Sequence, residues 1–552
     1  MVKAVRQYWI LLLVPGIVLG CSVLLRSAAG PFWLSANYDP AYQYLLNGLR
    51  LLKSLVPNHI DHPGTPLQML CAAVCWLFNA GRSIHDLALC VFKSPEFYLH
   101  ASFVVLAGLS FLTSVFLAGY VFLRTKDILA AVLTQLPALC FLVLRSWDTG
   151  EPVLPVAANV FPETLLIAIV NLFNFCLFQR LFIKTSKGAY AATVLWGFVC
   201  GMGVAVKITF VPLLAVPMII LSWRNRAVLL ISCILSFVVW TLPIVSIYPA
   251  LGKWFYSILT HTGSLGGGNA GIIEARQYWE NWKNIICEQV GLAWLLLLAG
   301  GLCFWKLAIK KWEWQTSCLA SVIMSVVLQW AVVAKNPGEH YLLPGMGLFS
   351  AVLAIAYLQG PFQKPLGQRI VLVFVAASVL AGLWQALEYR QKLEGLTKDI
   401  KGFYDHVQEQ YKGFNVVGFY RSSGQAGALA FGDMASGSWD ELRQAYPDSF
   451  DFNRWTYRIR DIRGSRVFSN DLMATYPGVI FLGDGDYDFS PTAYSVHLLE
   501  KGRMESVFLL TNTTEKQAFM LHLAANYYDQ KGDHLKAVEC NARASALHYA
   551  LP

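Results

Sequence analysis

The sequence predicts a polytopic α-helical membrane protein with about 11 transmembrane helices and a C-terminal α/β domain that ends in helices. Of its 552 residues, 56% are hydrophobic and 14% are charged, and the mean hydropathy is +0.48. Soluble domains carry about 25% charged residues, so most of this chain is expected in lipid. From residue 387 the sequence becomes charged and aromatic, which is typical of a soluble domain.

The membrane spans are predicted from runs of about 20 apolar residues, the length that crosses a bilayer. The first run, 8–26, follows Lys3 and Arg6. Its alternative is a cleaved signal peptide, which the many later runs disfavour. The other predicted spans are 97–123, 128–144, 161–182, 189–206, 208–223, 227–247, 289–307, 316–334, 341–359 and 368–386.

Cations predict the orientation. The loops on the side of Lys3 and Arg6 are all basic, with Arg124, Lys126, Arg180, Lys184, Lys187, Arg224, Arg226, Lys306, Lys310, Lys311, Lys364 and Arg369. Basic loops face the cytoplasm, so the C-terminal domain is expected outside, and a bacterial inner membrane is the expected location. Residues 65–80 are also apolar, but a span there would invert every later loop. We expect this segment to lie at the outer membrane surface.

The chain therefore divides into a transmembrane domain, 1–386, and an extracytoplasmic domain, 387–552. Within the first, 27–96 forms one long outer loop. In the second, 416–420 and 479–482 are predicted strands and 440–446 a helix. The final stretch, 516–551, is predicted to be helical, either as a packed cap or as a single repeat-like hairpin.

The first outer loop holds the leading candidate for a catalytic group. Asp39 precedes Pro40 and an aromatic run that includes Tyr42. Carboxylates held close to a bilayer indicate a polar cavity, although an Asp before Pro also suits a helix N-cap. Further along, Asp61 and His62 lie in a rigid turn between prolines, where the imidazole is placed to contact phosphate or sugar hydroxyls or is satisfied by backbone.

Three more acidic residues follow at two span ends predicted to lie outside. Asp148 and Glu151 are placed to bind Mg²⁺ or Mn²⁺ together with Asp39, because oxygen ligands suit these ions. The alternative to metal binding by Asp148 is an ion pair with Arg145. Glu163 opens the next span, where an acid is favoured by the helix dipole in any case.

Three basic or polar features share the same predicted face. Lys207 interrupts apolar sequence, so it needs a partner, for which an anionic phosphate is one candidate; snorkelling to the interface is the alternative. His340 and Tyr341 lie at the outer end of a later span. The glycine-rich loop 263–271 is either a lid or a linker.

Together these motifs resemble the GT-C superfamily of membrane glycosyltransferases. The Tyr38-Asp39-Pro40 stretch resembles the first-loop acidic motif of protein O-mannosyltransferases, aminoarabinose transferases and oligosaccharyltransferases. The other matching motifs are His62 to Leu67, Gly203 to Lys207, His340 to Pro344 and, for oligosaccharyltransferases, Arg145 to Glu151. Gly64 replaces the second proline of the family's Pro-Pro pair, and the oligosaccharyltransferase Trp-Trp-Asp signature is absent, which leaves the acceptor open.

The resemblance implies an enzyme that takes a sugar from a polyprenyl-phosphate-linked donor and transfers it to a hydroxyl of a lipid, glycan or protein acceptor outside the membrane. It makes Asp39 the general base and assigns donor or acceptor contacts to Tyr42, Asp61, His62, Asp148, Glu163, Lys207, His340 and Tyr341. No nucleic-acid partner is expected. The competing class is a lipid or glycan transporter or flippase, which would place charges near the middle of its spans.

Overall fold

The structure is a computed structural model of the chain. It describes residues 2–59, 63–142, 155–183, 186–263, 266–411, 415–418, 422–436, 440–445, 450–453, 458–461, 479–483, 495–511, 521, 525 and 534–549. The chain forms two compact units. Unit 1 comprises Met1–Ala28, Ser54–Val74 and His100–Leu393, and unit 2 comprises Ala29–Lys53, Cys75–Leu99 and Glu394–Pro552.

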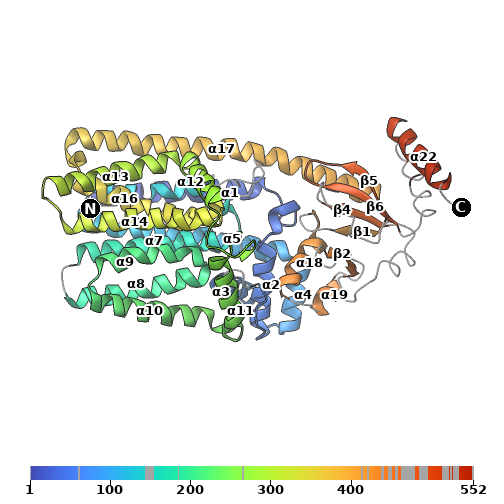
Figure 1. Cartoon of the computed structure of the whole chain (residues 1–552), viewed down its shortest axis with the longest axis horizontal. Coiled ribbons are helices and arrows are strands. Elements are labelled where there is room, and N and C mark those ends of the chain that lie inside the picture. Colours follow the sequence, from blue (N-terminus) through green and yellow to red (C-terminus); the bar gives the residue numbers. More distant parts are fainter. Residues whose placement is uncertain are drawn as a thin grey trace. The chain divides into compact units, whose positions relative to one another are not determined.

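Unit 1 is a bundle of apolar helices, several of which run alongside one another in Figure 1. Within the described residues, nine helical stretches are long and apolar enough to cross a membrane. Seven of them each lie within one helix, namely α1 (Val2–Ala28), α5 (Pro95–Thr125), α7 (Pro162–Phe182), α8 (Ser186–Val206), α13 (Val290–Ala308), α14 (Trp314–Lys335) and α17 (Pro365–Gln410). The other two are Trp223–Thr260, which contains α10 (Trp223–Thr241) and α11 (Tyr248–Thr260), and Glu339–Gln359, which contains α15 (Leu343–Gly347) and α16 (Phe349–Gln359). The polytopic helical fold is thereby confirmed.

Two predicted spans form broken helices instead. The segment 128–144 contains α6 (Ile128–Leu133) and the 3₁₀ turn η2 (Leu136–Leu142), and 208–223 contains η4 (Ile208–Leu214) and α9 (Ala215–Ile220). Prolines explain the breaks, because Pro137 and Pro212 cannot donate the backbone hydrogen bond that continues an α-helix. The expected count of 11 spans is therefore not confirmed.

Helices α8 and α10 pack closely because glycines face the contact. A Cβ added at Gly197 would lie 2.5 Å from the backbone oxygen of Leu229, and one at Gly201 would lie 2.2 Å from that of Cys233. These two glycines are one helical turn apart, so together they form the small-residue stripe by which membrane helices approach closely.

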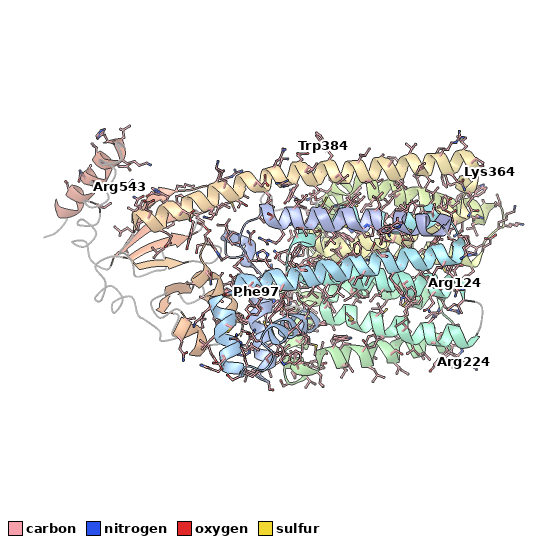
Figure 2. All side chains as sticks on the ribbon, turned by 180° about the vertical axis from the view of Figure 1, so that it is seen from behind. Phe97, Arg124, Arg224, Lys364, Trp384 and Arg543 are labelled. Carbon is pink, nitrogen blue, oxygen red and sulfur yellow. The ribbon has the colours of Figure 1, made fainter. Side chains whose placement is uncertain are left out.

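Basic residues collect at one end of this unit. Figure 2 shows Arg124, Arg224 and Lys364 at the same end of the bundle. Arg124 lies in the last turn of α5, Arg224 in the first turn of α10, and Lys364 directly before α17. This is the arrangement that the alternating basic loops predict.

Unit 2 contains a mixed six-stranded sheet with strand order β3-β2-β1-β4-β6-β5. Strand β1 (Asn415–Gly418) lies between β2 (Phe450–Asn453) and β4 (Val479–Gly483), parallel to both. Strands β3 (Arg458–Asp461), β5 (Ser495–Lys501) and β6 (Ser506–Thr511) pair antiparallel with their neighbours. The strand predicted at 479–482 is confirmed as β4, and the one predicted at 416–420 is confirmed over 416–418 as the neighbouring β1, with 419 and 420 outside the described residues.

The helices of unit 2 include segments of the predicted first outer loop. Helix α2 (Ala41–Leu52) contacts α18 (Gln425–Ser436), and α4 (Ile84–Lys93) contacts α19 (Asp440–Ala445). A Cβ at Gly432 of α18 would lie 2.9 Å from the backbone oxygen of Tyr42. The last described helix is α22 (His534–Tyr549). The parts of the loop at 29–53 and 75–96 thus belong to the same compact unit as the C-terminal sheet, whereas its residues 54–74 belong to unit 1.

Candidate functional site

Four of the sequence-predicted site residues meet in unit 1. The carboxylate of Glu163 pairs with the ammonium of Lys207. His340 Nε2 lies 3.8 Å from the same oxygen, Glu163 Oε1, and Lys207 Nζ lies 4.4 Å from the centroid of the Tyr341 ring. We call these four residues the Glu163 cluster. Because its members come from three separate parts of the chain, only the fold brings them together.

The members of the Glu163 cluster differ in exposure. The side chains of Glu163 and Lys207 are each 3% exposed, whereas that of His340 is 45% exposed. The expectation that Lys207 snorkels to the interface is therefore wrong. Its charge is compensated inside the protein by Glu163 and by the face of the Tyr341 ring.

Local structure holds the acid in place. Glu163 lies in the first turn of α7, directly after Pro162 at the helix start. The neighbouring Thr164 donates its hydroxyl hydrogen bonds to the backbone oxygens of Val156, at 2.6 Å, and Asn159, at 2.8 Å. The positive end of the helix dipole also favours a carboxylate at this position, and the donor or acceptor contact assigned to Glu163 stays a prediction.

The lysine follows a glycine-shaped turn. Lys207 comes directly after α8, and its backbone amide donates to the oxygen of Gly203 at 3.0 Å. A Cβ at Gly203 would lie 2.6 Å from the ring of Phe210. Glycine is therefore required where the chain turns from α8 into η4, and this turn directs Lys207 toward α7.

The segment that carries His340 is held at several points. Gln329 Nε2 of α14 donates to the backbone oxygen of Tyr341 at 2.7 Å. From α12 (Ala275–Glu288), Asn281 Nδ2 donates to the oxygen of Ala334 at 2.8 Å, and beyond that helix Gln289 Nε2 donates to Glu339 Oε1 at 3.4 Å. The sequence did not single out these amides.

The glycine-rich loop 263–271 joins α11 (Tyr248–Thr260) to α12. Its ends are closed by backbone hydrogen bonds, from Thr262 N to Asn269 O and from Gly271 N to Thr260 O. Lys335 Nζ also donates to the oxygen of Leu259 at 2.7 Å, beside the end of α11. In its described residues this loop is a tight hairpin-like turn.

Asp39 and Tyr42 belong to unit 2. Asp39 is half-buried between η1 (Ser35–Tyr38) and α2. The N-cap of α2 is Pro40, without a side-chain capping bond, so the alternative of Asp39 as the N-cap residue is not confirmed.

Tyr42 is fully buried, and its hydroxyl donates to Glu96 Oε1 at 2.9 Å. Glu96 also accepts from the backbone amides of Phe32 and Trp33, at 2.8 Å and 3.2 Å. Tyr42 therefore helps to order the start of this loop through Glu96, an acid that sequence reasoning missed. Glu96 lies in the first turn of α5, a position that would otherwise indicate nothing beyond a favourable helix dipole.

Four other predicted site residues lie outside the described residues, namely Asp61, His62, Asp148 and Glu151. In the part of the chain that the structure describes, no three His, Cys, Asp or Glu side chains form a group able to hold a metal ion. Two of the three predicted metal ligands are outside that part, so the divalent-cation site stays a prediction.

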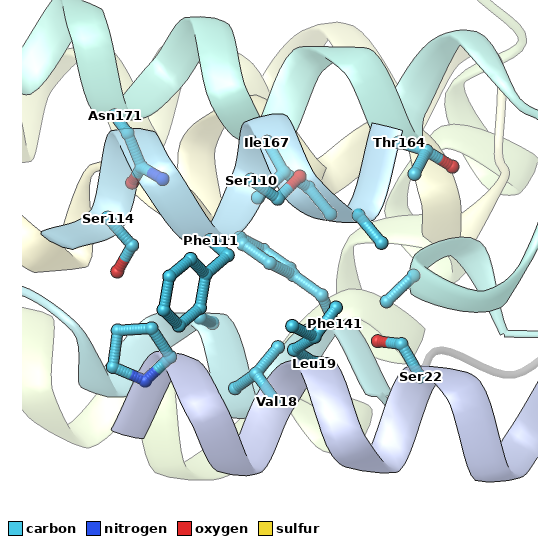
Figure 3. A pocket seen from close by; sticks show the side chains of 14 residues that line it. Val18, Leu19, Ser22, Ser110, Phe111, Ser114, Phe141, Thr164, Ile167 and Asn171 are labelled. Carbon is cyan, nitrogen blue, oxygen red and sulfur yellow. The ribbon is translucent and has the colours of Figure 1, made fainter. Parts of the chain in front are cut away.

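A cavity lies between α1, α5 and α7 (Figure 3). Its walls are mainly apolar, with hydroxyl and amide groups from Ser22, Ser110, Ser114, Thr164 and Asn171. Of the residues lining it, none is charged. Thr164 adjoins Glu163 in the sequence, so the cavity reaches the turn of α7 that carries the cluster.

The fold and the Glu163 cluster define a polytopic helical membrane protein with a buried ion pair beside a half-exposed histidine. No protein-family model and no curated protein matches the chain. Among solved structures it is similar to the crystal structure of ArnT from Cupriavidus metallidurans bound to undecaprenyl phosphate, with 12% identity over 89% of this chain and 97% of that chain and a TM-score of 0.44. A similarity of this size assigns neither a family nor a function.

Proposed function

We propose that the chain is a membrane glycosyltransferase that moves a sugar from a polyprenyl-phosphate-linked donor to an acceptor hydroxyl on the extracytoplasmic face. The Glu163 cluster is the observation that carries this proposal. Three of its members lie in motifs that resemble the GT-C pattern, Lys207 at the glycine-rich turn and His340 with Tyr341 at the later span end, and all of them are in contact with one another or with Glu163.

The position of the cluster agrees with the proposed face. Glu163 opens α7, Lys207 follows α8 and His340 follows α14. Lys364 lies beyond the far end of α16, which runs back through the bundle after the His340 segment. The cluster is thus at the end of unit 1 opposite to the basic residues, which are the ones expected in the cytoplasm.

The proposed reaction is a displacement at the anomeric carbon. The bond from this carbon to the acceptor oxygen forms, the bond to the phosphate oxygen breaks, and the phosphate leaves with the electron pair. The resemblance of its motif assigns to Asp39 the removal of the proton from the acceptor hydroxyl, a role worth roughly 10²- to 10⁴-fold in rate. The Glu163 cluster stabilises the negative charge that grows on the leaving phosphate.

A divalent cation held by Asp39, Asp148 and Glu151 is a second element of the proposal. Mg²⁺ or Mn²⁺ would supply charge neutralisation for the phosphate. Removing metal with a chelator and restoring Mg²⁺ or Mn²⁺ tests this element by itself: activity that is unchanged by chelation would remove the metal from the proposal.

The test of the proposed function uses purified full-length protein in vesicles with polyprenyl-phosphate-sugar donors from lipid extracts, read by mass spectrometry. A new sugar adduct on an acceptor is expected. Asp39→Asn should lower the rate at least about a hundredfold, whereas Asp405→Asn, at an acid of unit 2 that is 56% exposed, should not. Movement of lipid without any covalent product would instead indicate the transporter.

A further inference from the structure

We infer that His340 in its imidazolium form is the anion-binding group of the Glu163 cluster, and that anion binding takes up a proton there. Lys207 then acts as a positioning residue whose charge is already used inside the protein. This inference rests on the proposed function, because the anion it concerns is the phosphate of the donor.

The ammonium of Lys207 is buried together with its partner acid. Lys207 and Glu163 are each 3% exposed and paired with each other, and the Tyr341 ring covers the ammonium at 4.4 Å. For Lys207 to contact a phosphate, this pair would have to separate and leave the Glu163 carboxylate buried without its partner, which is strongly unfavourable. Direct contact between Lys207 and the ligand is therefore disfavoured.

The net charge of the Glu163 cluster depends on the protonation of His340. Glu163 and Lys207 cancel, so the cluster is neutral when the imidazole is neutral and carries one positive charge when it is protonated. The imidazole is 45% exposed. Of the three side chains Glu163, Lys207 and His340, it is therefore the one that a ligand can reach. Glu163 Oε1, 3.8 Å from Nε2, favours the protonated form, whereas the desolvation of the ring and the Lys207 ammonium oppose it.

The charged and polar groups around the imidazole come from several elements. Glu163 on α7 and Lys207 after α8 face the imidazole. On its own segment, Tyr341 stacks beside it and Glu339 accepts from Gln289. From α14, Lys335 donates to the oxygen of Leu259. Protonation of His340 is thus the step that makes the cluster attractive to an anion.

The consequence is a pH-dependent affinity. If anion binding and protonation favour each other, the anion binds more tightly as the pH falls, because the imidazolium form that binds it becomes more populated. The probe must keep its own charge over that range. A phosphodiester such as farnesyl methyl phosphate does so, because it has no second proton to lose near neutral pH.

Calorimetric titration of full-length protein in detergent with farnesyl methyl phosphate, from about pH 5.5 to about pH 8.5, tests the inference. Wild type should bind about tenfold more tightly at the acidic end. His340→Gln should bind weakly at every pH. His340→Lys, which keeps a positive charge throughout, should bind tightly with little pH dependence.

His406→Gln is the matched control, because His406 is 41% exposed and lies 3.1 Å from Glu500. This variant should keep the wild-type pH dependence of binding.

Two outcomes would overturn the inference while leaving the proposed function standing. One is a wild-type affinity that does not change with pH, and the other is a His340→Gln protein that keeps the wild-type dependence. If Lys207→Met abolishes binding in a folded protein while His340→Gln leaves binding unchanged, the anion-binding group is Lys207 and not His340. If wild type binds the probe at no pH, the donor class of the proposed function fails as well.

Discussion

At the scale of single residues, the Glu163–Lys207 pair combines two buried charges that neither could sustain by itself. Each side chain is 3% exposed, and an ion that is taken out of water is stabilised only while its partner stays in place. The sequence identified Lys207 as a charge in need of a partner but suggested an external one. The partner is an acid that precedes it by 44 positions, a separation that no local pattern encodes.

This pairing predicts strong coupling between the two positions. Glu163→Gln or Lys207→Met alone should lower the unfolding free energy by about 3–5 kcal/mol, because each leaves an uncompensated buried charge. The double variant should recover much of this loss. Thermal unfolding of the purified proteins in detergent measures the effect, and a double variant as unstable as the sum of the two single ones would contradict it.

A second residue-scale prediction concerns acid stability in unit 2. Glu441 accepts from Lys53 at 2.6 Å and lies 3.2 Å from His85 Nδ1. Burial by itself would raise the pKa of Glu441, but the hydrogen bond and charge of Lys53, with the backbone and His85, outweigh it and lower the pKa. A lowered pKa in the folded state means stability that is present above the unfolded value and is lost as the pH falls through the folded one.

Unit 2 should therefore lose stability in acid partly through Glu441. Hydrogen exchange of α19, α2 and α4 should accelerate as the pH falls below about 4.3, the ordinary value for a glutamate, relative to segments without such a pair. Glu441→Gln should flatten this pH dependence. An unchanged acid profile in that variant would show that other carboxylates control it.

At the scale of secondary-structure elements, the sequence located the long helices well because each is a run of apolar residues bounded by cations or turn formers. It located the short ones poorly. Pro137 and Pro212 break two expected spans, and proline in an apolar run does not by itself distinguish a kinked span from a broken one, since neighbouring helices can satisfy the freed backbone groups. Local pattern does not contain that tertiary information.

The contact between α8 and α10 gives the prediction at this scale. Gly201→Ala should destabilise unit 1, because the added Cβ would stand 2.2 Å from the backbone oxygen of Cys233 and force the two helices apart. Gly108→Ala in α5 is the matched control, since nothing lies within 4 Å of its added Cβ. The melting temperature in detergent should fall for Gly201→Ala and stay constant or rise for Gly108→Ala. Equal behaviour of the two variants would contradict the close packing.

At the scale of the whole molecule, the sequence predicted which charged and polar residues lie at each end of the bundle. It predicted their individual contacts less well. The alternation of basic loops places Arg124, Arg224 and Lys364 together, as Figure 2 shows, and assigns the members of the Glu163 cluster to the other end. It did not show that Tyr42 would be buried against Glu96, because aromatic residues in an amphipathic run serve packing and binding equally well. Contact geometry decides between these roles, and it depends on the fold.

The orientation of unit 1 in the membrane can be tested with a natural cysteine. Cys287, near the end of α12, is exposed and lies close in sequence to Gln289, which contacts the His340 segment through Glu339. If the Glu163 cluster faces outward, a membrane-impermeant maleimide should label Cys287 in intact cells, and Cys287→Ser should remove that signal.

Serine should first replace the partly exposed Cys90, Cys140 and Cys540. In this background, with Cys287→Ser, Arg224→Cys should be labelled only after the membrane is permeabilised, because Arg224 opens α10 at the opposite end. The reverse pattern would place the cluster in the cytoplasm, and a polyprenyl-linked donor would then have to be used on that side.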